Sequence, residues 1–137
     1  MSIYPIIKMG HPTLRKVAAP VASSDIDSPE MRTLIADMVE TLHDAGGIGL
    51  AAPQIDRPIQ LAIIKVPGGP SRYGDIESIP LTVFFNPVLT VLDPAEAGYW
   101  EGCLSVPGLR GFVHRPQHVR VDYMDITGTP ASLELKG

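Results

Sequence analysis

The residues of this chain that could do chemistry gather in two short motifs. The first is G-I-G-L-A-A-P-Q at residues 47–54, where small residues let a backbone approach a ligand closely and the polar Gln54 ends the run. The second is E-G-C-L-S-V-P-G at residues 101–108, which places the single cysteine, Cys103, among turn residues instead of inside an apolar periodic run. Such a placement favours a chemical role for this thiol over packing.

Each motif taken alone admits other interpretations. A phosphate-binding loop at residues 47–54 fails because the glycines follow a helical pattern, and no third glycine or Gly-Lys-Ser/Thr completes either known fingerprint. A glycine helix end leading into a buried turn, with Gln54 satisfying local backbone groups, stays open. Three interpretations of Cys103 also stay open: an inert small residue, which ranks first, a metal ligand, and a nucleophile or redox thiol.

A helix from Pro29 to Ala45 precedes the first motif. Ser28 suits the N-cap, Pro29 the first helical position, and Glu30 the positive end of the helix dipole, while a Gly-Gly pair follows Ala45. Apolar residues recur at helical spacing and form one stripe. These are Met31, Leu34, Ile35, Met38, Val39 and Leu42.

Beyond this helix the sequence predicts only strands and loops. Runs rich in β-branched and apolar residues, bounded by Pro, Gly, Asn or Asp, predict four strands and a C-terminal hairpin. The segment 67–80, with its glycines and prolines, reads as a surface loop within one domain spanning residues 1–137. The four strands are 59–66, 82–85, 88–92 and 119–123, and the hairpin turns at 125–130 into 132–135.

The overall composition excludes several classes of function. A net charge of -4 and a pI near 5.4 argue against a nucleic-acid footprint, which needs concentrated Lys and Arg. No run approaches the ~20 apolar residues of a membrane span, and the first residues lack the apolar core of a secretory signal. A soluble cytoplasmic protein without membrane or nucleic-acid partners is therefore expected.

The ordered pair of motifs, about fifty residues apart, resembles the first two signatures of the peptide deformylase family. The resemblance runs from the N-terminal Ile-Tyr-Pro-Ile and Gly10-His11-Pro12 to the hairpin at Asp125. It implies an α+β fold with mixed and antiparallel strands around helices. It also implies a hydrolase that uses Fe2+ or Zn2+ to remove the formyl group from the N-terminal formylmethionine of nascent polypeptides, with an N-formylmethionyl peptide as substrate and the ribosome as a partner.

The resemblance also implies roles for individual residues at the reaction centre. Cys103 would be a thiolate ligand of the metal, which suits a soft sulfur donor that the bound ion keeps deprotonated. The backbone N–H of Leu104 and the side-chain amide of Gln54 would meet the formyl oxygen as negative charge develops on it. The two motifs would therefore have to converge in space.

Other carried-over roles concern the substrate peptide and the support of the cysteine loop. Ile48 and Gly49 would pair with the extended peptide backbone, and Arg110 would contact the peptide further along. Glu101 and Arg115 would form an ion pair that orients the cysteine loop. The alternative for this pair is two unconnected surface charges.

The chain departs from the family in its third signature. That signature is H-E-x-x-H on a helix, which supplies two metal ligands and a general base, and none of the four histidines begins it. His114 and His118 are not expected to replace the pair, because Pro116 disfavours a helix and an extended segment separates them by roughly 13 Å. We therefore expect a C-terminally truncated family member that lacks the metal-site helix, exposes core surface, binds its metal weakly and is inactive as it stands.

Three functional hypotheses remain open from the sequence. The first is a deformylase whose sequence is incomplete. The second is a non-catalytic, deformylase-like protein that binds N-terminal methionyl peptides. The third is a thiol hydrolase that uses Cys103 with His114 as its base.

Overall fold

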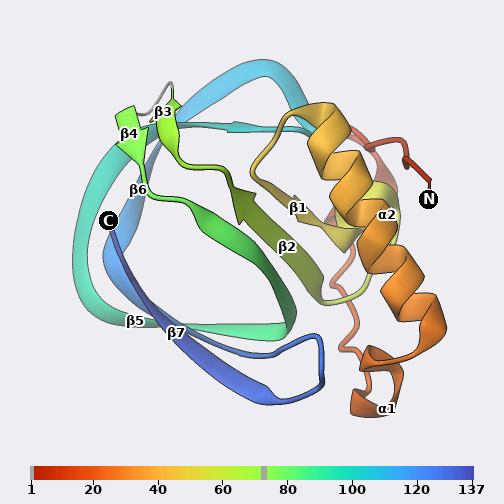
Figure 1. Ribbon diagram of the computed structural model, residues 1–137. Coiled ribbons are helices and arrows are strands. Elements are labelled where there is room, and N and C mark those ends of the chain that lie inside the picture. Colours follow the sequence, from red (N-terminus) through yellow and green to blue (C-terminus); the bar gives the residue numbers. More distant parts are fainter. Residues whose placement is uncertain (1, 72–73) are drawn as a thin grey trace.

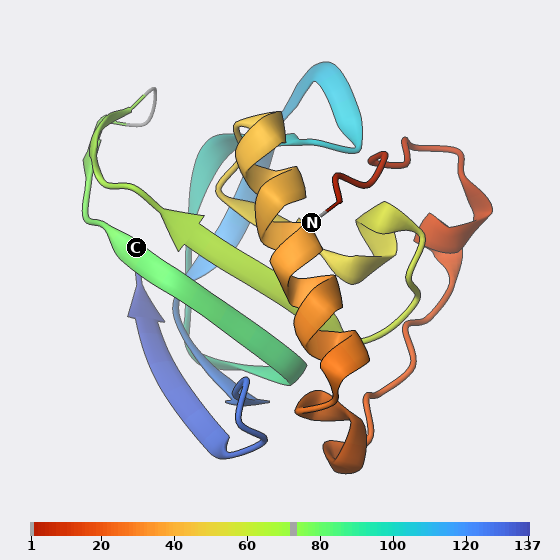
Figure 2. The ribbon, with the colours of Figure 1, turned by 45° about the vertical axis from the view of Figure 1, so that its right-hand side comes forward.

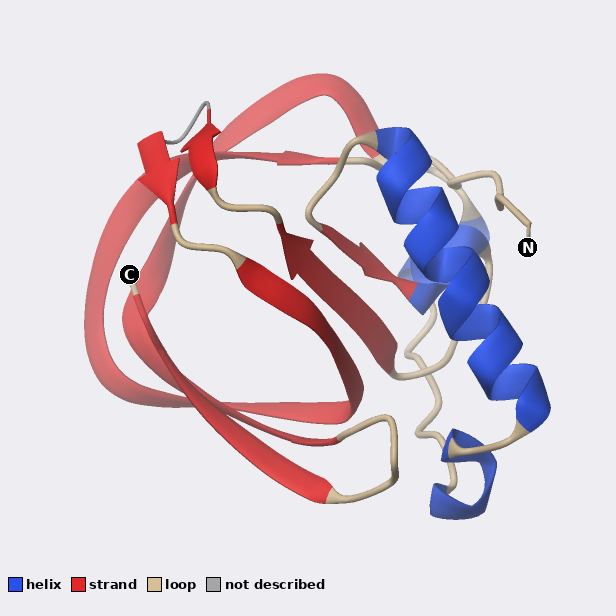
Figure 3. Cartoon of the chain, viewed as in Figure 1, coloured by secondary structure: helices blue, strands red, loops and turns tan. Residues whose placement is uncertain are grey.

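The computed structural model describes residues 2–71 and 74–137 and shows an α+β fold (Figure 3). The helical elements are η1 (Pro12–Arg15), α1 (Ser23–Ile26), α2 (Pro29–Ala45) and η2 (Ala52–Ile55), where η denotes a 3-10 helix. The strands are β1 (Gly49–Ala51), β2 (Leu61–Val66), β3 (Gly69–Ser71), β4 (Gly74–Ile76), β5 (Ile79–Cys103), β6 (Val106–Met124) and β7 (Pro130–Lys136). Within these residues no helix is long and apolar enough to cross a membrane.

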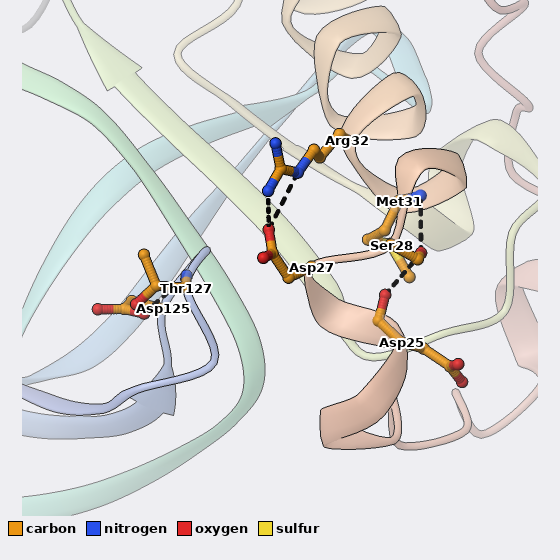
Figure 4. A network of polar contacts seen from close by, with 7 residues as sticks. All are labelled: Asp25, Asp27, Ser28, Met31, Arg32, Asp125 and Thr127. Carbon is orange, nitrogen blue, oxygen red and sulfur yellow. Dashed lines mark hydrogen bonds and ion pairs between the residues drawn. The ribbon is translucent and has the colours of Figure 1, made fainter.

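Helix α2 has the bounds that the sequence predicts, and its caps explain why. The Ser28 hydroxyl oxygen accepts the Met31 N–H at 3.2 Å, and the same hydroxyl donates to the Asp25 carbonyl at 2.8 Å (Figure 4). Gly46 ends the helix in the left-handed conformation, with φ at 68°. Both ends of the helix are therefore fixed by local chemistry.

The main sheet is antiparallel, with strand order β1-β2-β5-β6-β7 among the described residues. Strands β5 and β6 are long and curve away from the part of the sheet that α2 covers (Figure 1). The predicted C-terminal hairpin is confirmed as β6-β7. In its turn the Asp125 carboxylate accepts the Thr127 N–H at 2.9 Å (Figure 4) and the Thr129 N–H at 3.0 Å. Hydrogen bonds from the Thr127 hydroxyl and from the Thr129 backbone lower the pKa of that carboxyl.

Three details of the predicted elements were wrong. The predicted strands 82–85 and 88–92 belong to the single strand β5, because Asn86 takes a φ of 51° and the register with β6 shifts there instead of ending. The predicted surface loop 67–80 contains the short paired strands β3 and β4. The 3-10 helix η2 also lies where only strand and loop were expected.

The buried core lies between α2 and the sheet formed by β1, β2 and the start of β5. Figure 2 shows α2 crossing these strands. Apolar residues of α2 and of the strands belong to one buried cluster. Each fully buried aliphatic side chain of this kind stabilises the fold by about 1.5–3 kcal/mol. The central members of this core are Leu34, Ile35, Met38, Leu42, Leu50, Ile55, Leu61, Ile63, Val83 and Phe85.

The curved part of the sheet has the opposite character. Leu89 on β5 is 70% exposed. Trp100 and Phe112 are each more than half exposed, although they contact one another with their ring centroids 5.6 Å apart. Apolar side chains are also exposed at Val88 and Val91 on β5 and at Leu135 on β7. Several large apolar side chains of this part of the sheet are thus exposed, and whether an absent helix would cover them stays a prediction.

Replacing Ile63 by alanine should lower the free energy of unfolding by about 2–5 kcal/mol, because this side chain is fully buried in the core and leaves a cavity. Urea unfolding followed by circular dichroism measures the change. Val17→Ala is the matched control, since Val17 is 95% exposed and its truncation should cost no more than about 0.5 kcal/mol. Equal effects of the two substitutions would contradict this description of the core.

Candidate functional site

The first motif begins where α2 ends and forms one edge of the main sheet. The Ile48 carbonyl accepts the Lys65 N–H at 2.9 Å, and Gly49 pairs with Ile64 on β2. Strand β1 is last in the strand order, with β2 as its neighbour in the sheet. The backbone turns directly from β1 into η2, which carries Gln54 on its 3-10 turn.

The second motif forms the tip of the long β5-β6 hairpin. Cys103 ends β5 and pairs with Val106, so that Leu104 and Ser105 make the two-residue turn between the strands. Cys103 is exposed, whereas Ser105 is buried with 3% of its surface accessible. The turn therefore presents the thiol outward and holds its serine against the body of the protein.

The two motifs meet through the side chain of Gln54. Its Oε1 accepts the backbone N–H of Ala51 at 3.0 Å, as a residue at the third position of a helical turn can do for the cap. Its Nε2 donates to the Ser105 hydroxyl at 3.1 Å and lies 3.7 Å from the Cys103 sulfur. The structure thus brings the predicted residues Gln54 and Cys103 together.

Gly47 lets the second motif pack against the first. A Cβ atom at this position would lie 2.9 Å from Leu104 Cδ1 and 3.1 Å from Leu42 Cδ1. Leu104, half-buried, packs against the core cluster through this gap. The first glycine of the motif therefore serves the contact with the cysteine turn as well as the end of the helix.

An N-terminal strap, residues 2–9, ties both motifs to α2. The Ile7 N–H donates to the Gln54 carbonyl and the Met9 N–H to the Ser105 carbonyl, each at 2.8 Å. Earlier in the strap, Ser2 and Tyr4 donate main-chain N–H groups to side chains of α2, Asp37 Oδ1 and Thr41 Oγ1. Sequence reasoning missed this strap and the contact of Ser105, although Ser105 stood inside the second motif.

Glu101 and Arg115 form the predicted ion pair. The guanidinium donates from Nε to Oε1 at 2.5 Å and from its terminal nitrogen to Oε2 at 2.7 Å, a two-point geometry. The hydrogen bond from Arg115 holds the pKa of the Glu101 carboxyl below its usual value. The alternative of two unconnected surface charges was wrong, and the orienting role of the pair stays a prediction.

The remaining predicted residues lie along the same hairpin. Arg110 is opposite Gly102 on β6, one position from Cys103. His114 is opposite Gly98, five residues before Cys103, which corresponds to about 16 Å along a strand. An imidazole at that distance cannot accept the thiol proton, so the geometry opposes the thiol hydrolase hypothesis.

The fit of the described residues to a metal ion is incomplete. Cys103 offers an exposed sulfur beside Gln54, but among residues 2–71 and 74–137 no group of three His, Cys, Asp or Glu side chains could hold an ion. His118, for example, contacts Glu134 at 3.2 Å on the distant part of the sheet. A tetrahedral site needs at least three protein donors, so these residues supply part of such a site and not all of it.

Comparison with known proteins gives one consistent family. The family model described as polypeptide deformylase matches residues 3–137. Peptide deformylase 2 of Pseudomonas syringae is 48% identical over 125 residues, which are 91% of this chain and 69% of that protein. Peptide deformylase 1 of Bordetella pertussis is 47% identical over 98% of this chain and 75% of its own length.

Solved structures show the same likeness. The Met-Ala-Ser-bound class I type b peptide deformylase from Acinetobacter baumannii superposes with a TM-score of 0.93 at 32% identity, covering 100% of this chain and 86% of that one. The peptide deformylase from Ehrlichia chaffeensis in complex with actinonin gives a TM-score of 0.87 at 29% identity, covering 100% and 77%. The curved hairpin and the N-terminal elements are thus shared with these structures.

Replacing Arg115 by glutamine should raise the pKa of Glu101 toward its ordinary value, because the two-point hydrogen bond is lost. A carboxyl with a lowered pKa in the folded state stabilises it at pH values above the unfolded pKa, and this stabilisation is lost as the pH falls through the folded value. Carbon-detected NMR titration of Glu101 measures the shift, with Arg15→Gln as the control on an exposed arginine elsewhere. An unchanged Glu101 titration in Arg115→Gln would contradict the pair in solution.

Replacing Met9 by proline should lower the free energy of unfolding by about 1–3 kcal/mol, because the Ser105 carbonyl loses its N–H donor from the strap. Met9→Ala keeps that N–H, and Met9 is 63% exposed, so this control should be close to neutral. Chemical unfolding of both variants makes the comparison. If alanine proved as costly as proline, the side chain and not the main-chain bond would be the important feature.

Proposed function

Because this chain belongs to the polypeptide deformylase family, we propose that it carries the substrate-binding and oxygen-binding residues of a site for removing the formyl group from the N-terminal formylmethionine of nascent polypeptides. The reaction is hydrolysis of a linear amide and yields formate and a free amino terminus. The observation that carries the proposal is the Gln54 amide, which hydrogen bonds hold beside the Cys103 sulfur. A cytoplasmic location and the ribosome as a partner follow from the nature of this substrate.

In the proposed site Gln54 and Leu104 bind the formyl oxygen. The amide nitrogen of Gln54 has two hydrogens, one directed at Ser105 and one on the side of Cys103. The Leu104 N–H belongs to the turn residue directly after that cysteine. Fixed donors of this kind each lower a reaction barrier by about 3 kcal/mol when charge develops on the oxygen they face.

The substrate peptide would bind by adding a strand at the edge of the sheet. Strand β1 has β2 on one side in the strand order, so its other side is the edge at which an extended chain can pair. Ile48 and Gly49 supply main-chain groups at its start, and Arg110 lies further along, on β6 opposite Gly102. The Met-Ala-Ser peptide in the Acinetobacter structure and the actinonin in the Ehrlichia structure support a peptide-like ligand.

Cys103 would contribute one thiolate ligand to a divalent ion, Fe2+ or Zn2+. Because the described residues lack the other donors and the printed sequence contains no H-E-x-x-H, we propose that a polypeptide of these 137 residues holds such an ion weakly and does not release formate by itself. The edge strand, Gln54 and the cysteine turn do not depend on the missing donors.

A second candidate function is peptide binding without catalysis. The specific observation in its favour is that the β1 edge and the oriented Gln54 amide are present, whereas the residues that the structure describes contain no group of three potential metal donors. This hypothesis gives the same peptide-binding surface as the first one. The two differ in turnover only.

The experiment that tests the proposal combines elemental analysis, formate release and peptide binding on the 137-residue polypeptide. After dialysis against Zn2+ and gel filtration, we expect well under one equivalent of metal, and Cys103→Ser should remove what remains. Formate release from a formylmethionyl peptide should stay at background. One equivalent of tightly bound metal with sustained turnover would contradict the proposal that these residues supply too few metal donors.

Peptide binding is measured separately by NMR with Met-Ala-Ser. We expect chemical-shift changes at Ile48, Gly49 and Gln54, and none at the exposed Val17 on the N-terminal side of α1. The absence of changes at these three residues at millimolar peptide would count against both the deformylase and the peptide-binding proposals.

A further inference from the structure

The Gln54 amide must be held at two points if one particular N–H is to face a ligand. Its Oε1 accepts the Ala51 N–H at 3.0 Å, and this bond decides which end of the amide is oxygen, since a flipped amide would place two donors face to face. A single hydrogen bond at the oxygen still leaves rotation about the last side-chain torsion, which is broad for glutamine. A second contact, at the nitrogen, is needed.

The two groups near the Gln54 nitrogen differ in their capacity to provide that contact. The sulfur of Cys103 lies 3.7 Å away, and sulfur is a weak acceptor. The Ser105 hydroxyl lies 3.1 Å away, within ordinary hydrogen-bond distance. Ser105 is therefore the stronger of the two partners.

Ser105 is itself immobilised. It is 3% exposed, it occupies the two-residue turn between Cys103 and Val106, and its carbonyl accepts the Met9 N–H at 2.8 Å. The same strap donates the Ile7 N–H to the Gln54 carbonyl. Because both backbones are tied to residues 7–9, the main chains of Gln54 and Ser105 are held at a separation that lets the hydroxyl reach the amide.

We propose that Ser105 is a positioning residue, which fixes the Gln54 amide so that its second N–H points toward the Cys103 side of the site. Ser105 acts through Gln54 and is given no contact with the substrate. The consequence for catalysis rests on the function proposed above, in which that N–H receives the formyl oxygen. The hydrogen bond itself is a property of this chain and can be tested without turnover.

The test follows the side-chain amide protons of the three glutamines, Gln54, Gln60 and Gln117, in the 15N-labelled 137-residue chain. Before any substitution, the Gln54 amide protons should exchange with solvent more slowly than those of Gln117, whose amide contacts Arg115 at an exposed position. Ser105→Ala should accelerate Gln54 exchange about fivefold, as the loss of one hydrogen bond implies, and shift its amide resonances. Ser105→Thr keeps the hydroxyl and should restore both readouts.

Ser24→Ala is the matched control, because Ser24 is exposed on α1 and should leave Gln54 unchanged. Fast exchange of Gln54 in the unsubstituted chain, or an unaltered Gln54 signal in Ser105→Ala, would overturn the proposal. The first of these measurements needs no variant, so it decides the matter even if Ser105→Ala fails to fold. Failure of the peptide-binding experiment would instead count against the proposed function and leave the Ser105 to Gln54 contact intact.

Discussion

The hydrogen bonds of one glutamine amide are the constraint on which the site depends. An amide has one acceptor oxygen and two donor hydrogens, and it presents one particular donor in a fixed direction when its other groups are bonded to the protein. Here the acceptor is satisfied by Ala51 and one donor by Ser105. These partners come from segments more than fifty residues apart, so the fold must place the edge strand next to the hairpin tip.

This placement is produced by backbone contacts around the two motifs. The strap donates to carbonyls of both Gln54 and Ser105, and the absence of a side chain at Gly47 leaves room for Leu104. Behind these contacts lies the core between α2 and the sheet, which fixes where the helix ends and therefore where the first motif starts. Because β1 connects the end of α2 to Gln54, a change in the helix end would displace Gln54. A change in the strap would displace Ser105, whose carbonyl it binds.

What could be predicted from the sequence follows from how local each feature is. Helix α2 was predicted with its bounds because local residues mark both of its ends. Ser28 and Pro29 mark the start, and the glycines after Ala45 mark the end. The continuity of β5 was missed because Asn86 and Pro87 are turn residues by composition, whereas in the sheet they form an irregularity that the strand passes through. The short strands β3 and β4 span too few residues to show any period.

The site divides in the same way. The convergence of Gln54 with Cys103 and the pairing of Glu101 with Arg115 were predicted from the resemblance, since side chains of those types stand in recognisable motifs. The strap could not be predicted, because a main-chain N–H donor is present in every residue except proline and leaves no trace in the sequence. Ser105 was overlooked for a related reason, since a serine in a turn is unremarkable until its hydroxyl is seen to face Gln54.

The strongest contacts that orient Gln54, the residue proposed to bind the formyl oxygen, involve no metal donor. Gln54 is oriented by Ala51 and Ser105, which contact its side chain, and by the Ile7 N–H, which donates to the Gln54 carbonyl. The position of the Leu104 N–H is set by the hairpin turn. Donors that are fixed before a reaction avoid the energetic cost of reorganising while charge develops, which is the source of their effect. In the proposed site that preorganisation would come from the edge strand, the hairpin tip and the strap, whose hydrogen bonds to Gln54 involve no metal-binding side chain except the weak contact with Cys103.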